Sequence, residues 1–337
     1  MTETRPIRVG VIGAGRIGKI HVENLSYRVP GAALAAIADV NLPAAQEMAA
    51  RFKIPMAVAD YTALLTESNI DAVAICSPSD THARLIVEAA QAGKHIFCEK
   101  PIDYELDKID AALEAVSQAG VKLQVGFNRR FDVNFANARQ MVAEGNVGDP
   151  HILRITSRDP EPPPRTYARG AGSIFLDMTI HDFDMARYLM GSEVEEVSTA
   201  GATLIDPDVD DLDTAIVTLT FANGALGAID NSRRAVYGYD QRVEVFGSGG
   251  MVMAANRTPD TLSLSNSEGV HSAKPLYFFL ERYTESFATE MRQFIECIRQ
   301  DTPPPVTGWD GRMAVVIAIA AWKSYREKRP VRVSDTP

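Results

Sequence analysis

One short segment of the chain combines an acid and an imidazole at a spacing that suits proton transfer. The segment reads Asp177-Met178-Thr179-Ile180-His181, so the two groups stand four residues apart. On the helix predicted over 173–189, this spacing places both side chains on one face, ~5–6 Å apart at Cβ. An imidazole titrates near neutral pH and can accept a hydroxyl proton while a carboxylate orients the ring. The pair predicts His181 as a general base and Asp177 as its partner, although a surface polar pair would have the same spacing.

A lysine at the end of a strand supplies the next candidate group. The apolar run His95–Cys98 is followed by Glu99-Lys100-Pro101, and proline lacks the N–H that a strand would need to continue. A lysine there can hydrogen-bond a substrate oxygen and a nicotinamide ribose, whereas an ordinary ion pair with Glu99 is the alternative. We predict that Lys100 acts with Asp177 and His181 as the catalytic set for oxidising an alcohol.

A glycine-rich hexapeptide near the N-terminus predicts a dinucleotide site. Gly13–Gly18 (GAGRIG) follows the apolar run Ile7–Ile12 and opens a predicted helix. Glycines in this strand–loop–helix context let the backbone turn tightly and approach a pyrophosphate, whose charge lies at the helix N-terminus. The predicted cofactor contacts in the loop are Gly13, Gly15, Arg16 and Ile17.

The kind of nucleotide follows from Asp39, which ends the second apolar run, 21 residues after Gly18. An acid at that place accepts hydrogen bonds from ribose hydroxyls and repels a 2′-phosphate. The next residues, Val40 and Asn41, bring no arginine to neutralise such a phosphate, so NAD is favoured over NADP. Two further cofactor contacts are predicted at the ends of later strands, Ser77 and Glu99.

The elements that must position these residues fall into two patterns. Up to about residue 126, short apolar runs alternate with helices, which is typical of a doubly wound parallel sheet covered on both faces. Beyond about residue 150, successive strands are predicted over 195–204, 214–221, 226–233 and 241–246, which indicates an open, mostly antiparallel sheet. We therefore predict an α/β protein with an NAD-binding Rossmann domain over 1–126 and an α+β substrate-binding and oligomerisation domain over 127–337.

Composition excludes several classes of protein. The formal net charge of −10 disfavours binding to nucleic acid or anionic lipid. The longest apolar stretch, Met313–Trp322, is about half of what a membrane helix needs. No apolar signal segment opens the chain, and the three cysteines lack metal-like spacing, so a cytoplasmic protein with free thiols and no metal site is expected.

Taken together, these motifs resemble the glucose–fructose oxidoreductase and inositol dehydrogenase family, over nearly the whole chain. Longer stretches resemble the branch of that family that oxidises inositol, and they are more specific than the glycine pattern. They are Gly126–Asp132 (GFNRRFD), Ser157–Pro160 (SRDP), Asp177–Arg187 (DMTIHDFDMAR) and Ser232–Asp240 (SRRAVYGYD).

The resemblance implies NAD-dependent oxidation of a cyclic polyol, with myo-inositol expected, in a homotetramer built through the second sheet. It implies that Lys100, Asp177 and His181 are catalytic, and that the polyol is contacted by Arg129, Asp159, Tyr239 and Tyr283. Alternatives are a scyllo-inositol or pyranose dehydrogenase and, from another class, a non-catalytic NAD-sensing regulator. The stretch 160–173 (PEPPPRTYARGAGS) departs from similar chains, which leaves the accepted stereoisomer open.

Overall fold

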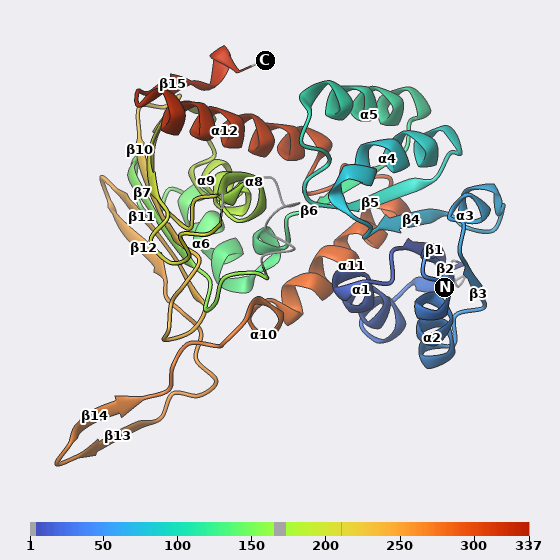
Figure 1. Cartoon of the computed structure of the whole chain (residues 1–337), viewed down its shortest axis with the longest axis horizontal. Coiled ribbons are helices and arrows are strands. Elements are labelled where there is room, and N and C mark those ends of the chain that lie inside the picture. Colours follow the sequence, from blue (N-terminus) through green and yellow to red (C-terminus); the bar gives the residue numbers. More distant parts are fainter. Residues whose placement is uncertain (1–4, 165–172, 210, 337) are drawn as a thin grey trace. The chain divides into compact units, whose positions relative to one another are not determined.

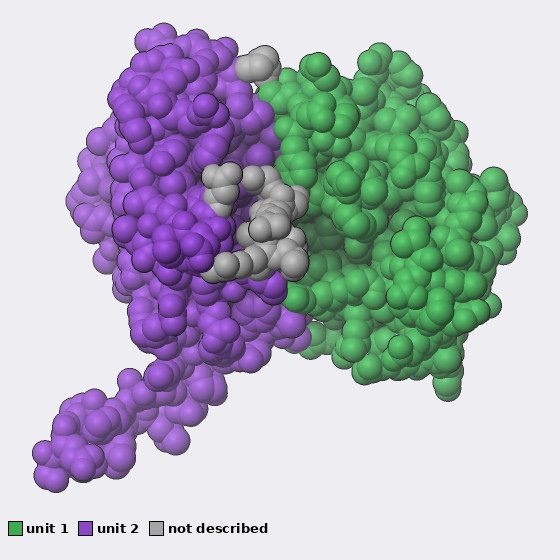
Figure 2. All heavy atoms as spheres, viewed as in Figure 1, with its two compact units in different colours: residues 1–131, 285–313 green, residues 132–284, 314–337 purple. Residues whose placement is uncertain are grey.

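The computed structural model describes residues 5–164, 173–209 and 211–336 of the chain. It divides into two compact units, one of residues 1–131 with 285–313 and one of residues 132–284 with 314–337 (Figure 2). The predicted domain boundary after residue 126 stays a prediction, and the two units are described separately below. Within the stretch 160–173, residues 165–172 lie outside the described part of the chain.

The first unit contains a six-stranded parallel sheet with the strand order β3-β2-β1-β4-β5-β6. Figure 1 shows α4 and α5 on one face of this sheet and α1 and α2 on the other. The predicted doubly wound parallel sheet is therefore confirmed. Its elements, in chain order, are β1 (Ile7–Ile12), α1 (Arg16–Tyr27), β2 (Ala32–Ala38), α2 (Leu42–Phe52), β3 (Met56–Val58), α3 (Thr62–Thr66), β4 (Ala72–Ile75), α4 (His82–Gln91), β5 (His95–Glu99), α5 (Leu106–Ala119) and β6 (Leu123–Gly126).

The core of this unit explains the near-continuous apolar strands. Side chains from neighbouring strands, among them Val11, Ile37 and Phe97, are fully buried because helices cover both faces. Helix α11 (Thr284–Gln300) comes from late in the chain and adds Met291 and Phe294 to the same core. The unit that carries the glycine loop is thus completed by a distant segment of the sequence.

The second unit is built on a seven-stranded sheet with the order β12-β11-β7-β10-β9-β8-β15. The neighbours β7 and β10 are parallel, and every other neighbouring pair in this sheet is antiparallel. The predicted mostly antiparallel sheet is confirmed. Its strands are β7 (Pro150–Arg158), β8 (Val194–Ala202), β9 (Thr214–Phe221), β10 (Leu226–Ser232), β11 (Asp240–Gly247), β12 (Gly250–Ala254) and β15 (Val331–Arg332).

Helices pack on one face of this sheet, and none of the helices in the described ranges covers the other face (Figure 1). Along β9 and β11, buried residues alternate with exposed or half-buried ones, as expected for a sheet with a single covered face. A hairpin of β13 (Ser263–Asn266) and β14 (Gly269–Ser272) extends away from the sheet with every residue exposed. The helices are α6 (Val133–Ala143), α8 (Ile174–Asp177), α9 (Ile180–Met190), α10 (Phe279–Arg282) and α12 (Gly308–Glu327), of which α12 runs from the first unit into the second.

One detail differs from the sequence-based expectation. The single helix predicted over 173–189 is two helices, α8 and α9. Tyr283, a predicted polyol contact, lies between α10 and α11. The three cysteines are free thiols. None of the helices in the described ranges is long and apolar enough to cross a bilayer.

Candidate active site

The predicted cofactor and catalytic residues of the first unit lie at the carboxyl ends of neighbouring strands. Gly13 follows β1, Asp39 follows β2, Ser77 lies just beyond β4, Lys100 follows β5 and Arg129 lies just beyond β6. Because the strands are parallel, the sheet order places these residues along one edge, with Asp39 first and Arg129 last. The strand order reverses between β1 and β4, and ligands of open α/β sheets bind outside the carboxyl ends at such a point.

Three glycines of the loop differ in the space that surrounds them. Gly13 has φ +108°, and an added Cβ there would lie 2.6 Å from the carbonyl oxygen of Cys76. At Gly18 an added Cβ would lie 2.0 Å from the carbonyl oxygen of Gly13, so helix α1 could not begin so close to the loop with a larger residue. At Gly15, by contrast, an added Cβ would meet nothing within 4 Å, which leaves space for a phosphate at the start of α1. This arrangement fits a pyrophosphate.

The Asp39 carboxylate holds the glycine loop through backbone hydrogen bonds. Its Oδ2 accepts a hydrogen bond from the Ala14 N–H at 2.6 Å, and its Oδ1 accepts one from the Asn41 N–H at 2.8 Å. A carboxylate has about four lone-pair sites, so acceptor capacity for two ribose hydroxyls remains. Val40, 96% exposed, stands beside this position without any charge. The geometry suits an unphosphorylated ribose.

Changing Asp39 and Val40 together should therefore change the cofactor preference. In Asp39→Ala/Val40→Arg, the repelling carboxylate is lost and a guanidinium can pair with a 2′-phosphate. We expect the ratio of kcat/KM with NADP to kcat/KM with NAD to rise about 10-fold or more. Steady-state kinetics with both cofactors measure this ratio, and Asp39→Ala/Val40→Gln is the matched neutral control. An unchanged ratio in the arginine variant would refute the role assigned to Asp39.

A buried histidine connects two of the strand-end turns. The His82 ring, 1% exposed, has Nε2 at 2.8 Å from the Ser77 carbonyl oxygen and Nδ1 at 2.7 Å from the Pro101 carbonyl oxygen. Pro101 directly follows Lys100 through a cis peptide bond. The His82 ring therefore fixes the Ser77 turn against the segment that carries Lys100.

In the second unit, the acid and the imidazole are presented by two helices rather than one. Asp177 is the last residue of α8, and His181 lies in the first turn of α9. At the break, the Thr179 N–H donates to the carbonyl oxygen of Ile174, one residue further back than in an α-helix. The predicted pairing on one continuous helix face is therefore wrong in its geometry.

A buried amide explains the break. The Thr179 hydroxyl donates to Asn231 Oδ1 at 2.7 Å, and Asn231 Nδ2 donates to Asp182 Oδ2 at 2.8 Å. All three side chains are fully buried, so their hydrogen bonds are costly to leave unmade. Asn231 on β10 thereby holds the residues on either side of Ile180 and His181 against the sheet. Sequence reasoning missed both Asn231 and Thr179, because nothing local marks a contact between positions so far apart.

A buried guanidinium joins two of the predicted site residues. Arg233 Nη2 lies 2.9 Å from Asp177 Oδ2, and Arg233 Nη1 lies 3.5 Å from Asp159 Oδ2. Burial lowers the pKa of Arg233, but the carboxylates of Asp177 and Asp159 raise it more, so that the net shift is upward. Sequence reasoning did not select Arg233, although it stands inside the Ser232–Asp240 stretch that carries the family resemblance.

Two predicted polyol contacts lie together in the same unit. The rings of Tyr239 and Tyr283 pack edge to face, with centroids 6.0 Å apart, and both residues are buried. Asp159 is tied to the loop after β10, because its carbonyl oxygen accepts a hydrogen bond from the Ala235 N–H at 2.7 Å. Arg129 belongs to the first unit, in the 3₁₀ turn Asn128–Phe131, where it is buried.

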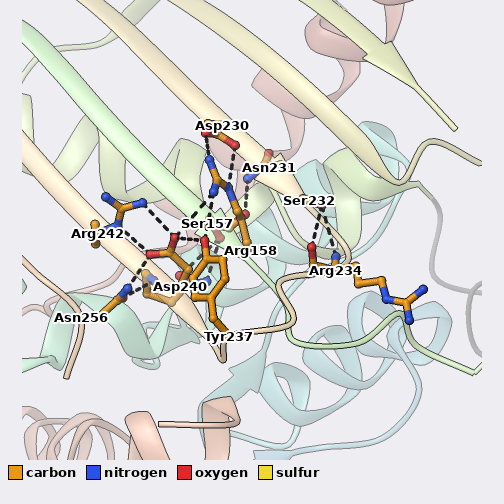
Figure 3. A network of polar contacts seen from close by, with 11 residues as sticks. Ser157, Arg158, Asp230, Asn231, Ser232, Arg234, Tyr237, Asp240, Arg242 and Asn256 are labelled. Atoms are coloured by element: carbon orange, nitrogen blue, oxygen red, sulfur yellow. Dashed lines mark hydrogen bonds and ion pairs between the residues drawn. The ribbon is translucent and has the colours of Figure 1, made fainter. Parts of the chain in front are cut away.

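Figure 3 shows a network of charged and polar side chains on β7, β10 and β11. The loop between β10 and β11 contains Arg233 and Tyr239. Arg158 binds Asp230 on β10 and also donates to the Tyr237 hydroxyl at 3.0 Å. The Tyr237 hydroxyl in turn donates to Asp240 Oδ2 at 2.6 Å, and Arg242 contacts the other oxygen of Asp240 at 2.7 Å. Both ends of the loop are therefore fixed to the sheet, which restricts where Arg233 and Tyr239 can point.

Known proteins resemble this chain in both of its units. A family model described as "Oxidoreductase family, NAD-binding Rossmann fold" matches residues 7–127, and one described as "GFO/IDH/MocA C-terminal domain" matches residues 135–253. The chain is 50% identical to a myo-inositol 2-dehydrogenase of Thermotoga maritima, over 98% of this chain and 99% of the relative. It is 45% identical to an inositol 2-dehydrogenase of Rhizobium meliloti, over 97% of this chain and 99% of the relative.

A solved structure shares the fold throughout. The crystal structure of scyllo-inositol dehydrogenase from Lactobacillus casei, with bound NAD(H) and scyllo-inositol, superposes with a TM-score of 0.91 at 30% identity. The match covers 98% of this chain and all of that chain.

Proposed function

Because the chain belongs to the GFO/IDH/MocA family of NAD-binding oxidoreductases, we propose that it oxidises one ring hydroxyl of a cyclic polyol, with myo-inositol as the preferred substrate. The observation that carries the proposal is the row of Asp39, Gly13, Ser77 and Lys100 along one edge of the parallel sheet. Relatives named as inositol 2-dehydrogenases at 45% and 50% identity support the choice of substrate.

The cofactor is held by residues of the first unit. Gly13, Gly15, Arg16 and Ile17 surround the pyrophosphate at the start of α1, and Asp39 accepts hydrogen bonds from the ribose of the adenosine half. Ser77 and Glu99, at the ends of later strands, contact the nicotinamide half. When bound, NAD accepts a hydride from the carbon that bears the reacting hydroxyl.

The proton of that hydroxyl goes to His181, which acts as general base. Asp177 orients the imidazole, and Arg233 holds Asp177 in place through their 2.9 Å contact. The Lys100 ammonium donates a hydrogen bond to the reacting oxygen and stabilises the negative charge that develops there. Each group thus has one task in this proposal. The Arg233 guanidinium also balances the negative charge of Asp177 beside His181.

The remaining hydroxyls of the ring are recognised by four polar side chains. Arg129 and Asp159 offer a guanidinium and a carboxylate, and a pair of tyrosines, Tyr239 and Tyr283, offers phenol groups and apolar ring edges. A polyol ring carries both a hydrogen-bonding rim and C–H faces, so this mixture suits it.

A scyllo-inositol preference is the nearest alternative, because the Lactobacillus casei relative is named for that isomer. The test is the appearance of reduced-nicotinamide absorbance after purified protein and NAD are mixed with myo-inositol, scyllo-inositol or D-glucose in turn. We expect the highest kcat/KM with myo-inositol. A higher kcat/KM with another ring reassigns the substrate, and tight NAD binding without turnover of any polyol favours a regulatory NAD sensor instead.

We also propose a cytoplasmic homotetramer that acts in inositol breakdown. Three free thiols agree with a reducing compartment. The uncovered face of the second sheet exposes large apolar side chains of the kind that subunit interfaces bury, namely Ile216, Leu226, Phe246, Met251 and Met253. Light scattering after size-exclusion chromatography measures the assembly, and a monomer would contradict it.

A further inference from the structure

Three ionisable side chains are buried together beside the proposed site, and the mechanism above does not use them as a group. They are His21 on α1, Glu99 at the end of β5 and Glu290 on α11. One atom from each lies within 4.8 Å of the others. The side chains of His21 and Glu290 are 0% exposed and that of Glu99 is 13% exposed. Groups so fully removed from water must be neutral or matched in charge.

The His21–Glu99 contact indicates which atom carries the hydrogen. His21 Nε2 lies 2.7 Å from Glu99 Oε1, and a carboxylate can only accept, so the imidazole donates from Nε2. Within the described residues, His21 Nδ1 has no hydrogen-bond partner. Phe97 and Phe287 pack against the ring in edge-to-face geometry, with centroids 4.9 Å and 5.9 Å away. A hydrogen on Nδ1 would be buried without an acceptor among the described residues.

Glu290 has the opposite problem, because no described residue donates a hydrogen bond to its carboxyl group. Its Oε1 lies 4.0 Å from His21 Nε2, too far for a hydrogen bond, and neither carboxyl oxygen has a hydrogen-bond partner among the residues described. Burial, and then the charge of Glu99, raise the pKa of Glu290 well above its usual value. The buried thiols of Cys76 and Cys98 also face this cluster. Neither thiol supplies a positive charge.

Glu99 links the cluster to the proposed chemistry. Its carboxylate lies against Gly126, where an added Cβ would lie 3.0 Å from Oε2, so a larger residue opposite Glu99 would press on the carboxylate. Lys100 is the next residue in the chain, and His21 belongs to the helix that follows the glycine loop. We propose that His21, Glu99 and a protonated, neutral Glu290 form a buried positioning unit that fixes the strand end bearing Lys100 against the cofactor helix α1. The role for Lys100 rests on the proposed function, whereas the protonation of Glu290 does not.

A divalent metal bound by the same three residues is the competing explanation, and the geometry disfavours it. A histidine that binds a metal through one nitrogen almost always donates its other N–H to an acceptor, yet His21 Nδ1 has none in the described part of the chain. The 2.7 Å separation of His21 Nε2 and Glu99 Oε1 is a hydrogen-bond distance.

The protonation of Glu290 can be tested without any enzyme assay. Glutamine has the shape of a protonated glutamate but does not titrate, so Glu290→Gln should fold normally. A carboxyl whose pKa is raised in the folded protein stabilises the fold below its unfolded pKa, near 4.5, and this contribution is lost as the pH rises toward the folded pKa. Between pH 6 and pH 9, the Tm of Glu290→Gln minus that of the unaltered protein should therefore increase by about 2 °C or more.

Glu296→Gln, on the exposed face of the same helix, is the matched control and should show no such increase. A Tm difference for Glu290→Gln that is negative and constant across this pH range would overturn the neutral assignment. So would one equivalent of Zn²⁺ retained by the unaltered protein, and lost in Glu290→Gln, when measured by elemental analysis after incubation and gel filtration.

The positioning role has its own readout. His21→Leu removes the donor to Glu99 and should lower kcat about 10-fold or more, while the Kd for NAD changes less than about threefold. His21→Gln retains an N–H near the same place and should restore most of kcat. Equal losses in both variants, or a loss confined to NAD binding, would overturn the positioning role. If no polyol is oxidised by the unaltered protein, the proposed function fails, and the Tm experiment still decides the state of Glu290.

Discussion

His181→Ala should lower kcat for polyol oxidation by about 10²–10⁴-fold, the usual contribution of a positioned general base. The substitution removes the proton acceptor from the chemical step, so the Kd for NAD should change less than about threefold. Steady-state kinetics at saturating NAD and polyol measure kcat, and fluorescence titration measures NAD binding. The effect is expected because His181 lies in the first turn of α9, where Thr179 and Asp182 are both fixed by Asn231.

His271→Ala is the matched control, since His271 is exposed on β14 of the same unit. Its kcat should stay within about twofold of the unaltered protein. A His181→Ala enzyme with near-normal kcat would remove His181 from the mechanism, and a loss of NAD binding equal to the loss of kcat would mean that the residue acts on the cofactor instead.

Arg233→Met should weaken both catalysis and the fold. Arg233 contacts Asp177 and Asp159, and a third acid, Asp211, also acts on its charge. Burial raises the pKa of Asp211, and Arg233 is one of the groups that lower it again. Without the guanidinium these carboxylates repel one another and Asp177 loses the contact that orients it. We expect kcat/KM to fall about 10–100-fold and the free energy of unfolding to fall by about 2 kcal/mol.

The neighbouring Arg234 is exposed and provides the control Arg234→Met, which should alter neither quantity measurably. Arg233→Lys should recover part of the stability but less of kcat/KM, because an ammonium cannot reproduce the planar fork that reaches two carboxylates. Denaturant unfolding and steady-state kinetics measure the two effects. Full activity in Arg233→Met would show that Asp177 needs no cation beside it.

The doubly wound sheet of the first unit could be predicted because its signals are local. A glycine loop directly after an apolar strand, an acid at the end of the next strand and Lys100 after a later one can each be read from neighbouring residues. Parallel pairing then brings these residues to one edge of the sheet, whereas the strand order itself came only from the structure. The antiparallel second sheet was likewise visible as consecutive alternating strands.

What could not be predicted depends on contacts between distant segments. Thr179 looks like an ordinary helical residue until Asn231, 52 positions later, binds its hydroxyl and splits the helix. Arg233 is followed by Arg234 in the sequence, and only the fold shows that Arg233 is buried while Arg234 is exposed. Glu290 lies in a helix whose pattern predicts a buried stripe, but its neighbours His21 and Glu99 come from the other end of the chain.

The bond from Ala14 to the Asp39 carboxylate bears on how this protein could evolve. The side chain that we propose to select the nucleotide also holds the glycine loop, so any lineage that changes this acid must first tolerate a looser loop. A descendant that uses NADP therefore needs two changes together: a basic residue for the 2′-phosphate, and another acceptor for the Ala14 N–H. Such coupled substitutions are rarer than single ones, which tends to keep this branch faithful to its present coenzyme.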